Sequence, residues 1–543
     1  MKTIRVIIIL LLSLGLFPLA VSARTIEVKL SQCPKPLLEN VRNRVANATA
    51  NDVVILNFDK AGKYEFDGSI SIKCNTIIKG VGSKNTRVIV KEGFSGGKST
   101  MKGDTFFAVY GTPSRKVKVE VRDIRFELAS HKGTLWETAP KHIIKICDGD
   151  GIVVDNATFL STDAVITHVD LRDCSNVVVQ NCLFENYNNC REGGCLWSRG
   201  GQNNIVVRNN VFWKYGNDEA FGCWGGVVKD ADVAIKNVTV EGNKFFYENK
   251  TKSKNNISID VLITFAHHGD ERVKHKCAID NIVFRNNTLT NNAPSKRNFL
   301  LNFDDMATLG KIEVYENTIK NNSRCQVSDG YMTDISINTG VKNKGEIFIS
   351  DNNVYNEAEI LWDGKHSGYT FIGVKNGNVQ VSNNYVQSDY PVAFVWCHGG
   401  NTLLNLNNNT ASMLYNTVIL NSSTKLEKVV INAEGNEFSG DTRFYCNNID
   451  ELELNFTNNI FNSSNDHFFV QEGAPKTSVV FDGNTINSLS GKGIMFANYS
   501  GKPYKFTKLQ VTNNIFNGIT KKSIGDSFNK NVTNKIIQNN IYR

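Results

Sequence analysis

The segment Ile205-Val-Val-Arg-Asn-Asn-Val-Phe-Trp213 contains a pattern that recurs along most of the chain. In this segment the apolar residue Val207 is followed by Asn210 and then by the apolar residue Phe212. The pattern recurs with its Asn at Asn243, Asn287, Asn317, Asn352, Asn384, Asn409, Asn436, Asn459, Asn484, Asn514 and Asn540, and in weaker form with Cys182, Ala157 and Ile124 in its place. Successive Asn positions are 23 to 44 residues apart. A minimum repeat length with irregular insertions is typical of a solenoid, in which each repeat forms one coil.

Short runs with the alternation of β-strands lie between these Asn positions. The run from Ile257 to Phe265 alternates apolar and other residues and is rich in β-branched side chains, which favours strand over helix. An Asn at one place in each coil tolerates a left-handed bend, and its amide can bond to the backbone or to the next Asn. The sequence therefore predicts an all-β fold, a single-stranded parallel β-helix.

A resemblance to known proteins supports this prediction. The Asn-Asn turns, the coil length and the segment Ile77-Ile-Lys-Gly-Val-Gly82 resemble the right-handed parallel β-helix proteins of the pectate-lyase-like superfamily, over roughly residues 50 to 543. The resemblance implies a right-handed coil. That superfamily includes polysaccharide lyases, glycoside hydrolases, epimerases and noncatalytic surface proteins, so the resemblance is specific for fold and not for chemistry.

We expect one long domain behind an N-terminal leader. Residues 1–23 combine a basic start, an apolar run and small residues, as a secretory signal peptide does. Residues 24–50 are predicted to form a capping segment, whose short amphipathic helix within 33–49 covers the open N-terminal end of the solenoid. Residues 51–543 are predicted to form the β-helix. No other stretch is apolar enough to span a membrane, so we expect a protein that is secreted, periplasmic or held at the cell surface. We also expect a monomer.

Charge and cysteine content narrow the classes of partner. The formal net charge is +8, and the basic residues are scattered. This distribution fits an acidic polymer and not nucleic acid, which binds blocks of basic residues. Twelve cysteines in an exported chain raise the question of disulfides. Cys190 and Cys195 are close enough in sequence to form one, whereas Cys182, Cys223, Cys397 and Cys446 are expected to be small buried residues.

The longest coils indicate where a binding site is expected. They run from Asn210 to Asn384, and the longest lies between Asn243 and Asn287. Long loops from neighbouring coils form walls, and a flat sheet between walls makes a groove for an extended polymer.

A row of acidic residues lies in these coils. Strand alternation predicts that Asp260, Leu262 and Thr264 face outward. The catalytic candidates of this row are Asp218, Glu219, Asp260, His268, Asp304 and Asp305. Paired carboxylates suit glycoside hydrolysis, because one protonates the leaving oxygen and the other activates water or attacks. Crowding of like charges would raise the pKa of one of them.

A second, basic group of residues suits a different reaction. Lys145 is predicted to point outward, and His168 and Arg199 occur near the ends of the next strands. β-Elimination on a uronate needs a base for the proton alpha to the carboxylate, and that carboxylate must be neutralised by Arg, Lys or a metal. Lyases of the resembled superfamily commonly use Arg or Lys as the base, some with calcium. Lys145 and Arg199 are therefore catalytic candidates. Calcium is a candidate cofactor, with oxygen ligands from Asp218, Glu219 and Asp260, although no compact calcium-loop motif is present.

Aromatic and amide side chains supply candidates for sugar binding. The predicted substrate-binding residues are Trp224, His267, Asn302 and Asn338. Trp213 and Trp396 could also stack on sugars, whereas Trp362 is expected to pack inside.

The acidic motifs depart from those of one named family. The polygalacturonase-like pattern has Asn-x-Asp, an Asp pair about one coil later, then Gly-His-Gly and Arg-x-Lys. Here Asn217-Asp218-Glu219 and Asp304-Asp305 are two coils apart, and Cys397-His398-Gly399-Gly400 lies far downstream. That mechanism is therefore not transferred, and no signature of the pectate lyases proper is present.

These patterns predict an exported enzyme that cleaves an extended, uronate-containing polysaccharide by β-elimination. The alternatives are a glycoside hydrolase that uses paired carboxylates and a noncatalytic carbohydrate-binding or surface β-helix protein.

Overall fold

The computed structural model describes residues 23–91, 105–128, 141–161, 167–186, 194–214, 219–225, 234–248, 261–267, 277–292, 299–303, 307–322, 325–326, 331–338, 345–357, 360–362, 365–366, 368–389, 392–397, 400–415, 418–420, 426–441, 444–447, 449–463, 469–472, 476–488, 496–498, 506–518 and 534–543.

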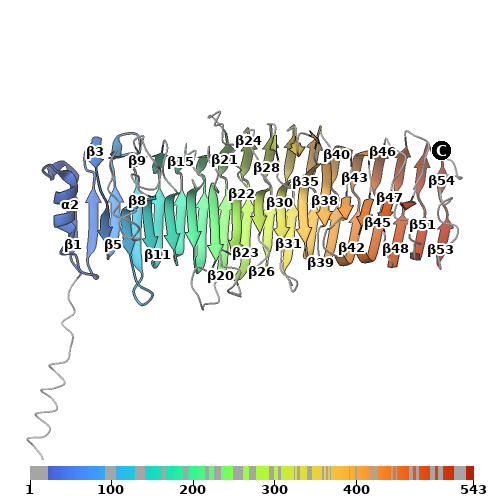
Figure 1. Ribbon diagram of the computed structural model, residues 1–543, viewed down its shortest axis with the longest axis horizontal. Helices are drawn as coiled ribbons and strands as arrows, with labels where there is room; N and C mark the ends of the chain where they lie inside the picture. Colours follow the sequence, from blue (N-terminus) through green and yellow to red (C-terminus); the bar gives the residue numbers. More distant parts are fainter. Residues whose placement is uncertain are drawn as a thin grey trace, which may run out of the picture.

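These residues coil into a long solenoid with parallel β-sheets along its sides (Figure 1). Sheet A has 19 strands, sheet C has 15, and sheet B forms the third side. A full coil passes through one strand of each sheet in the order A, B, C, and each strand pairs in parallel with its equivalent in the next coil. The predicted all-β parallel β-helix is confirmed.

The strands follow one another along the solenoid in chain order within each sheet. Sheet A contains β1 (Thr25–Lys29), β2 (Val53–Asn57), β5 (Asn75–Lys79), β8 (Val117–Arg122), β11 (Gly149–Asp155), β14 (Ser175–Gln180), β17 (Gln202–Arg208), β20 (Ala234–Glu241), β23 (Cys277–Arg285), β26 (Ala307–Leu309), β27 (Ile312–Tyr315), β31 (Glu346–Ser350), β36 (Gly377–Ser382), β39 (Gly400–Asn407), β42 (Leu426–Glu434), β45 (Ile449–Thr457), β48 (Lys476–Asp482), β51 (Phe506–Thr512) and β53 (Lys535–Gln538). Sheet B contains β3 (Gly62–Phe66), β6 (Thr86–Val90), β9 (Arg125–Leu128), β12 (Thr158–Ser161), β15 (Leu183–Asn186), β18 (Val211–Lys214), β21 (Lys244–Tyr247), β24 (Thr288–Asn291), β28 (Thr318–Asn321), β32 (Asn353–Asn356), β37 (Tyr385–Ser388), β40 (Thr410–Tyr415), β43 (Glu437–Asp441), β46 (Ile460–Ser463), β49 (Thr485–Ser488), β52 (Ile515–Asn517) and β54 (Ile541–Tyr542). Sheet C contains β4 (Ile70–Ile72), β7 (Thr105–Tyr110), β10 (His142–Cys147), β13 (Thr167–Arg172), β16 (Gly194–Arg199), β19 (Phe221–Gly225), β22 (Val261–His267), β25 (Phe299–Phe303), β30 (Tyr331–Asn338), β35 (Gly368–Lys375), β38 (Val392–Cys397), β41 (Val418–Leu420), β44 (Phe444–Asn447), β47 (Phe469–Glu472) and β50 (Phe496–Asn498). A small sheet contains β29 (Cys325–Gln326), β33 (Ile360–Trp362) and β34 (Lys365–His366).

The repeated Asn lies buried at the bend from sheet A to sheet B. Asn210 is typical: its Nδ2 donates to the carbonyl oxygen of Val179 at 2.9 Å and to Oδ1 of Asn243 in the next coil at 3.0 Å. Its backbone N–H donates to the same Oδ1 at 2.9 Å. Equivalent bonds continue to Asn540. Because buried backbone groups need partners, this ladder holds each bend closed, as predicted.

The left-handed residue of this bend is the one immediately before the ladder Asn. Asn209 and Asn383 both have φ of 55°, and Gly435 takes this position with φ of 66°. The backbone conformation and the hydrogen bonding, which the sequence analysis assigned to one Asn, are therefore divided between two adjacent residues. Only the second of these needs an amide, which explains why Gly, Asp and Glu also occupy the first.

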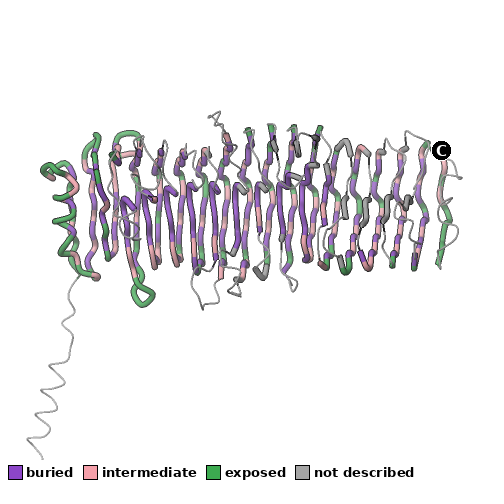
Figure 2. The backbone as a smooth tube through the Cα atoms, in the orientation of Figure 1, coloured by how far each residue is buried: buried purple, intermediate pink, exposed green. Residues whose placement is uncertain are grey.

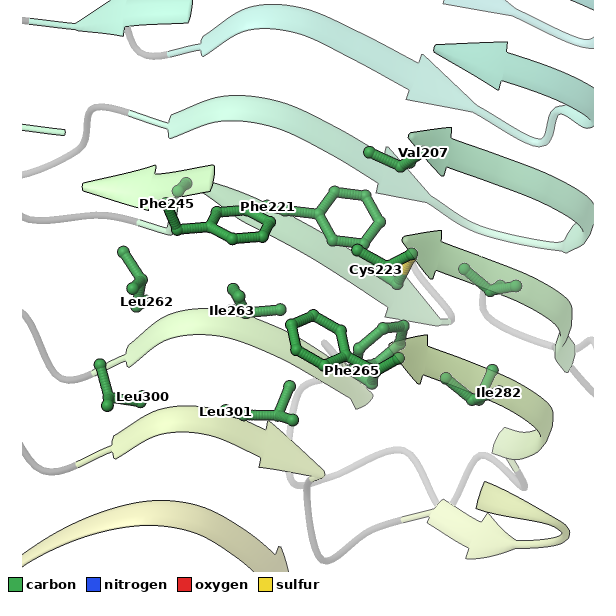
Figure 3. Close-up of a cluster of buried hydrophobic side chains, with 14 of the residues drawn as sticks. Val207, Phe221, Cys223, Phe245, Leu262, Ile263, Phe265, Ile282, Leu300 and Leu301 are labelled. Carbon is green, nitrogen blue, oxygen red and sulfur yellow. The ribbon is translucent and has the colours of Figure 1, made fainter. Parts of the chain in front are cut away.

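The interior is filled by side chains that stack from coil to coil. Phe184, Phe212 and Phe245 lie in one row with ring centroids 4.9 and 4.8 Å apart. Figure 3 shows the adjoining cluster, in which Leu262 and Leu300 point into the core beside their neighbours. Figure 2 shows that buried residues extend along the length of the solenoid.

One feature of sheet C corrects the expected strand alternation. Leu262, predicted to face outward, is fully buried in the core next to Ile263. The pairs Val261 with Phe299 and Ile263 with Leu301 leave Leu262 outside the regular register, so two consecutive residues point inward there. The alternation used to place Asp260 therefore does not extend across this bend.

The N-terminal end carries the helix α2 (Leu37–Val45), which is preceded by a short 3-10 helix, η1 (Leu30–Gln32). Val41 and Val45 of α2 are buried against the first coil, and the helix lies across the end of the solenoid in Figure 1. The predicted capping helix is confirmed. Strand β1 already pairs with β2, so the solenoid begins within the segment 24–50. Among the helices that the structure describes, none has the length and apolarity needed to cross a bilayer.

Among the cysteines whose side chains are described, Cys33, Cys74, Cys147, Cys174, Cys182, Cys223 and Cys397 are free thiols. Cys182, Cys223 and Cys397 are buried, as expected of small core residues. Cys190 lies outside the described residues, so its pairing with Cys195 stays a prediction.

Candidate functional site

The outer face of sheet C carries a cluster of charged side chains at β10, β13 and β16. Lys145 pairs with Asp170, and Arg172 pairs with Arg199, in adjacent strands. Their neighbours in each strand, including Ile144, Ile146, Val169, Leu171 and Leu196, point into the core. Strand alternation therefore places the four charged residues on one face, and we call them, with His142, the sheet C cluster.

Asp170 is the centre of the sheet C cluster. The carboxylate is fully buried, with Arg172 Nε 3.0 Å from its Oδ2 and Arg199 Nε 3.0 Å from its Oδ1. His142 Nε2 lies 3.4 Å from the same Oδ2. Burial alone would raise the pKa of Asp170, but the surrounding cations lower it below its ordinary value. Asp170 is therefore ionised and holds both arginines in place.

Lys145 and His142 are both driven toward their neutral forms. Lys145 is only 3% exposed, and burial, followed by the charge of Arg172, lowers its pKa below the ordinary value. Burial also lowers the pKa of His142 to about 3, so this imidazole is uncharged at neutral pH. At that pH the arginines are the cations that keep Asp170 ionised. A lysine with a lowered pKa in a cluster of charges is a group suited to general base catalysis.

Two tryptophans lie beside the cluster on the same face. Arg199 Cζ is 4.2 Å from the centre of the Trp197 ring, a cation–π contact. Trp224 follows in the next strand, opposite Arg199. A side chain at Gly222 would place its Cβ 2.6 Å from Trp224 Nε1 and 3.4 Å from Trp197 Cδ1. The glycine therefore allows both indole rings to lie close to the sheet.

Several buried polar atoms near the cluster have no hydrogen-bond partner among the described residues. These atoms are His142 Nδ1, Thr105 Oγ1, Thr167 Oγ1 and Trp197 Nε1. His142 pairs directly with Thr105 and Thr167 in the flanking strands, so three of the four atoms come from adjacent positions. Unsatisfied buried polar groups are rare in folded proteins, and their concentration here is a feature of binding sites.

A pair of carboxylates lies where the chain leaves sheet C. Asp148 follows β10 and Asp173 follows β13, and both line an open hollow of about 840 Å³ together with Lys116 and Lys236. Burial and then the carboxylate of Asp173 raise the pKa of Asp148. Asp173 Oδ1 accepts a hydrogen bond from Gly201 N at 3.0 Å. This hollow thus borders the sheet C cluster and does not contain it. We give the cluster more weight because its charges are in direct contact.

The structure places some of the predicted site residues together. Lys145 and Arg199 both act on the charge of Asp170, which makes them part of one cluster. Glu219 is buried just before β19. Trp224 and Asn302 are half-buried on the outer face of sheet C, farther along the solenoid.

Other predicted residues cannot be placed. Asp218, Asp260, His268, Asp304 and Asp305 lie outside the described residues. The strands β22 and β30 contain His267 and Asn338, but the side chains of these two residues are not described. The acidic row therefore stays a prediction. Within the part of the chain that is described, no three His, Cys, Asp or Glu are grouped as metal ligands, and two of the calcium ligands proposed above fall outside that part.

The sequence analysis missed Asp170, Arg172 and His142. The alternation in Thr167–Arg172, with apolar residues at Val169 and Leu171, was the available signal for Asp170 and Arg172. His168, which was grouped with the basic residues, instead lies inside the solenoid. Its Nε2 is 2.9 Å from Ser161 Oγ, and its ring stacks between Phe159 and Phe184. His168 is buried for the same reason as Leu262. His142 pairs with Thr167 and Ile144 pairs with Val169, so the register skips His168, and His168 and Val169 both point inward.

Comparisons with known proteins bear on the fold. No protein-family model matches the sequence, and no curated protein matches it significantly. Similar solved structures include the family 28 exopolygalacturonase of Yersinia enterocolitica, with 12% identity, 82% of this chain and 78% of that chain covered, and a TM-score of 0.38. DFA-IIIase from Arthrobacter chlorophenolicus A6 in complex with DFA-III has 11% identity and a TM-score of 0.41, with 76% of this chain and 94% of that chain covered. The tailspike of Pseudomonas phage phi297 has 12% identity and a TM-score of 0.45, with 89% of this chain and 83% of that chain covered. The long all-parallel sheets of this chain fit the pectate-lyase-like β-helix expected from the sequence.

Proposed function

We propose that this protein is an exported polysaccharide lyase that cleaves a uronate-containing polymer on the outer face of sheet C. One observation carries the proposal: Lys145, whose pKa is lowered, shares a face and a carboxylate partner with Arg172 and Arg199 in the next two coils. β-Elimination at a uronate needs this combination of a base and fixed positive charge.

The reaction assigns one role to each member of the cluster. Unprotonated Lys145 Nζ removes the proton alpha to the uronate carboxylate, and the developing negative charge spreads onto that carboxylate. Arg172 and Arg199 stabilise this charge; both reach Asp170 through Nε, and a guanidinium has further N–H groups for a substrate. A carbon–carbon double bond then forms as the bond from the beta carbon to the glycosidic oxygen breaks. The leaving oxygen finally takes up a proton, which leaves an unsaturated sugar and a new reducing end.

Asp170 acts through the arginines and not on the substrate. Its carboxylate offsets part of the positive charge and fixes both side chains before substrate arrives, which reduces the reorganisation needed during the reaction. Trp197 and Trp224 offer flat apolar surfaces on which sugar rings can stack.

The direct test follows the products. The purified mature protein is incubated with polygalacturonate, alginate and a neutral β-glucan, with and without calcium, while reducing ends and the ultraviolet absorbance of unsaturated sugars are recorded. A lyase produces both signals together. Reducing ends without absorbance would exclude elimination.

A second candidate function rests on the carboxylates at the end of sheet C. Asp148, with its raised pKa, could serve as the proton donor of a glycoside hydrolase, with Asp173 as the second carboxylate in the 840 Å³ hollow. In that case Asp148→Asn abolishes the release of reducing ends and Lys145→Met does not. If neither product signal appears across the panel, a noncatalytic carbohydrate-binding protein is the remaining alternative.

Export is part of the proposal and rests on the leader-like residues 1–23. Expression of the full chain with a tag at its C-terminal end, followed by N-terminal sequencing of the protein from the medium or periplasm, tests it. Retention of the uncleaved chain in the cytoplasm would contradict export.

A further inference from the structure

The net charge of the sheet C cluster limits how many carboxylates it can bind. Arg172 and Arg199 bring two positive charges, and the ionised carboxylate of Asp170 offsets one of them. Lys145 in its neutral form, which the proposed reaction requires, adds no charge, and neither does the uncharged imidazole of His142. The cluster therefore has one positive charge in excess, which matches a single carboxylate of the substrate.

The coil that follows the arginines presents an aromatic ring beside them. Trp224 lies opposite Arg199 in the next strand and is half-buried on the outer face of sheet C. The face of an indole ring is electron-rich, so it attracts the C–H groups of a sugar and disfavours a carboxylate. The sugar unit that lies beside the bound uronate on this side is therefore favoured when it is neutral.

A buried carboxyl group shares this coil with Trp224. Glu219 is 6% exposed and directly precedes Ala220 and Phe221, which both point into the core. Thr167 precedes the corresponding inward pair of β13, so the register places Glu219 in the row of Thr167 on the outer face. A carboxyl group at this position offers no positive charge to a second uronate, and it repels that uronate when ionised.

The strands on both sides of the cluster continue its central row without charge. Toward the C-terminal end, the row of Lys145 passes through β19, β22, β25 and β30 at Gly222, Thr264, Asn302 and Ser336. Toward the N-terminal end, the residue of β7 in register with Lys145 is Ala108. The two lysines of the adjoining hollow are matched there by Asp148 and Asp173. These residues supply no second positive charge in excess.

We propose that the substrate of this site is a heteropolysaccharide in which each uronate is flanked by neutral sugars, and not a homopolymer of uronates. The proposal rests on the lyase function proposed above and specifies its substrate. In β-elimination the carboxylate that must be stabilised belongs to the sugar that loses its proton, so one carboxylate binds at the arginines. Neighbouring strands are about 4.8 Å apart, close to the length of one sugar unit. In a homopolymer the next carboxylate would therefore lie near residues such as Trp224 and Glu219, where it gains no counter-charge.

The test compares polymers that contain the same uronate at different spacing. Polygalacturonate is compared with the rhamnogalacturonan backbone, in which galacturonate alternates with neutral rhamnose. Polyglucuronate is compared with hyaluronan, in which glucuronate alternates with a neutral N-acetylated sugar. For each polymer, kcat/KM is obtained from the initial rate of ultraviolet absorbance increase at one fixed ionic strength.

Two variants of the β19 coil test the cause of the preference. Trp224→Arg adds a cation opposite Arg199, and Glu219→Gln removes a carboxyl group at nearly constant shape. Leu403→Arg adds the same charge as the first variant at an exposed position of sheet A, and it is the control. Thermal unfolding confirms that each variant is folded.

We expect the alternating polymer of each pair that is cleaved to have a kcat/KM about tenfold above that of its homopolymer, because the homopolymer brings uncompensated charge. Trp224→Arg should raise kcat/KM for the homopolymer and reduce the ratio about fivefold, an effect that loss of the ring alone does not produce. Glu219→Gln should reduce the ratio by a smaller factor, and Leu403→Arg should leave it unchanged.

Three results would overturn the inference. If a homopolymer is cleaved at least as efficiently as its alternating partner, the inference fails and the lyase activity stands. The same holds if the ratio is unchanged in every folded variant of the β19 coil. If none of the four polymers gives ultraviolet absorbance, both the inference and the proposed lyase activity fail.

Discussion

The bend between sheets A and B is nearly the same in every coil, whereas the outer face of sheet C differs from each coil to the next. At the bend, eleven successive steps from Asn210 to Asn540 repeat one set of hydrogen bonds. On sheet C, the register position of Lys145 is taken by Asp170, then Trp197, then Gly222. Both regions contain buried polar groups, but the hydrogen-bond partners of these groups differ.

The difference shows what each region is suited to do. The ladder completes its hydrogen bonds within the protein, so its Asn residues contribute stability and have little capacity left for a ligand. The sheet C cluster concentrates two arginines, a lysine and one carboxylate, and leaves polar atoms such as His142 Nδ1 without a partner among the described residues. Regular repetition therefore indicates structure, and departure from it indicates a site.

Replacing the base of the cluster should give the largest effect. Lys145→Met removes the proposed base, so we expect kcat to fall about 1,000-fold, or about 4 kcal/mol in activation free energy. The measurement is the initial rate of ultraviolet absorbance increase with excess polymer. Lys244→Met, at an exposed lysine of sheet B, should leave the rate unchanged. A Lys145→Met enzyme with the parent rate would remove Lys145 from the mechanism.

Removing the central carboxylate should affect both stability and pH dependence. Asp170→Asn leaves the half-buried Arg172 and Arg199 without the buried carboxylate that balances their charge, and we expect the free energy of unfolding to fall by about 3 kcal/mol. Because Asp170 raises the pKa of Lys145, the rising limb of the pH–rate profile should also move to lower pH. Urea unfolding and the pH–rate profile measure the two effects. Asp67→Asn, at an exposed aspartate, is the control. A profile that does not move would argue that Asp170 is structural only.

Breaking the ladder should lower stability without a specific effect on the reaction. Asn317→Ala removes the acceptor for Asn287 N at 2.9 Å and the donor to the carbonyl oxygen of Phe284 at 3.0 Å. We expect a loss of about 2 kcal/mol in the free energy of unfolding, measured in urea. Asn455→Ala, in the outer amide row of sheet A, removes a half-buried bond to Asn432 and should cost only about 0.5 kcal/mol. Equal losses in the two variants would contradict the distinction between the buried ladder and the surface.

Acid should destabilise the cluster through His142. The folded-state pKa of about 3 lies below the ordinary value, so between the two values the unfolded chain binds a proton that the folded chain does not. The free energy of unfolding should therefore fall as the pH drops below about 6.5, by at most about 1.4 kcal/mol per pH unit. Asp170, whose pKa is also lowered, adds to this loss only in more acidic solution. Denaturant unfolding between pH 7 and pH 4.5 should show a smaller slope for His142→Gln, and identical slopes would refute the assignment.

The smallest expected effect comes from extending the ladder by one coil. Cys182 occupies the ladder position before Asn210, and its thiol, a weak donor, contacts the carbonyl oxygens of Val154 at 3.6 Å and Gln180 at 3.0 Å. We expect Cys182→Asn to stabilise the protein by about 0.5 to 1 kcal/mol, measured by urea unfolding. Cys182→Ala should instead destabilise it, because it leaves a cavity. A destabilised Cys182→Asn variant would mean that packing and not hydrogen bonding governs this position.

Much of the fold was predictable because its signal is local and repeated. The Asn spacing, the alternating runs and the amphipathic segment that became α2 each reflect a requirement that recurs at one place in a coil. Alternation failed at Leu262 and His168, where sheet C turns two consecutive residues inward. A corner of this kind depends on how three sheets meet, and no pattern within one strand encodes it.

The candidate site was predictable only in part. Lys145 was identified as an outward cation, and Arg199 as a cation near the end of a strand. Asp170, which connects them, was missed because a single charged residue within a strand is ordinary in a sequence. Its role follows from the coil register, which places residues from β10, β13 and β16 side by side.

The sequence by itself determined that the chain forms a parallel β-helix, since each coil repeats the residue patterns that favour its strands and its bend. Only the tertiary structure decided which charges meet. The stacking of coils brings Lys145, Asp170 and Arg199 together on the outer face of sheet C, where burial and neighbouring charges shift the pKa values of Lys145 and Asp170. Those are properties of neighbours in space, and the sequence separates these neighbours by whole coils.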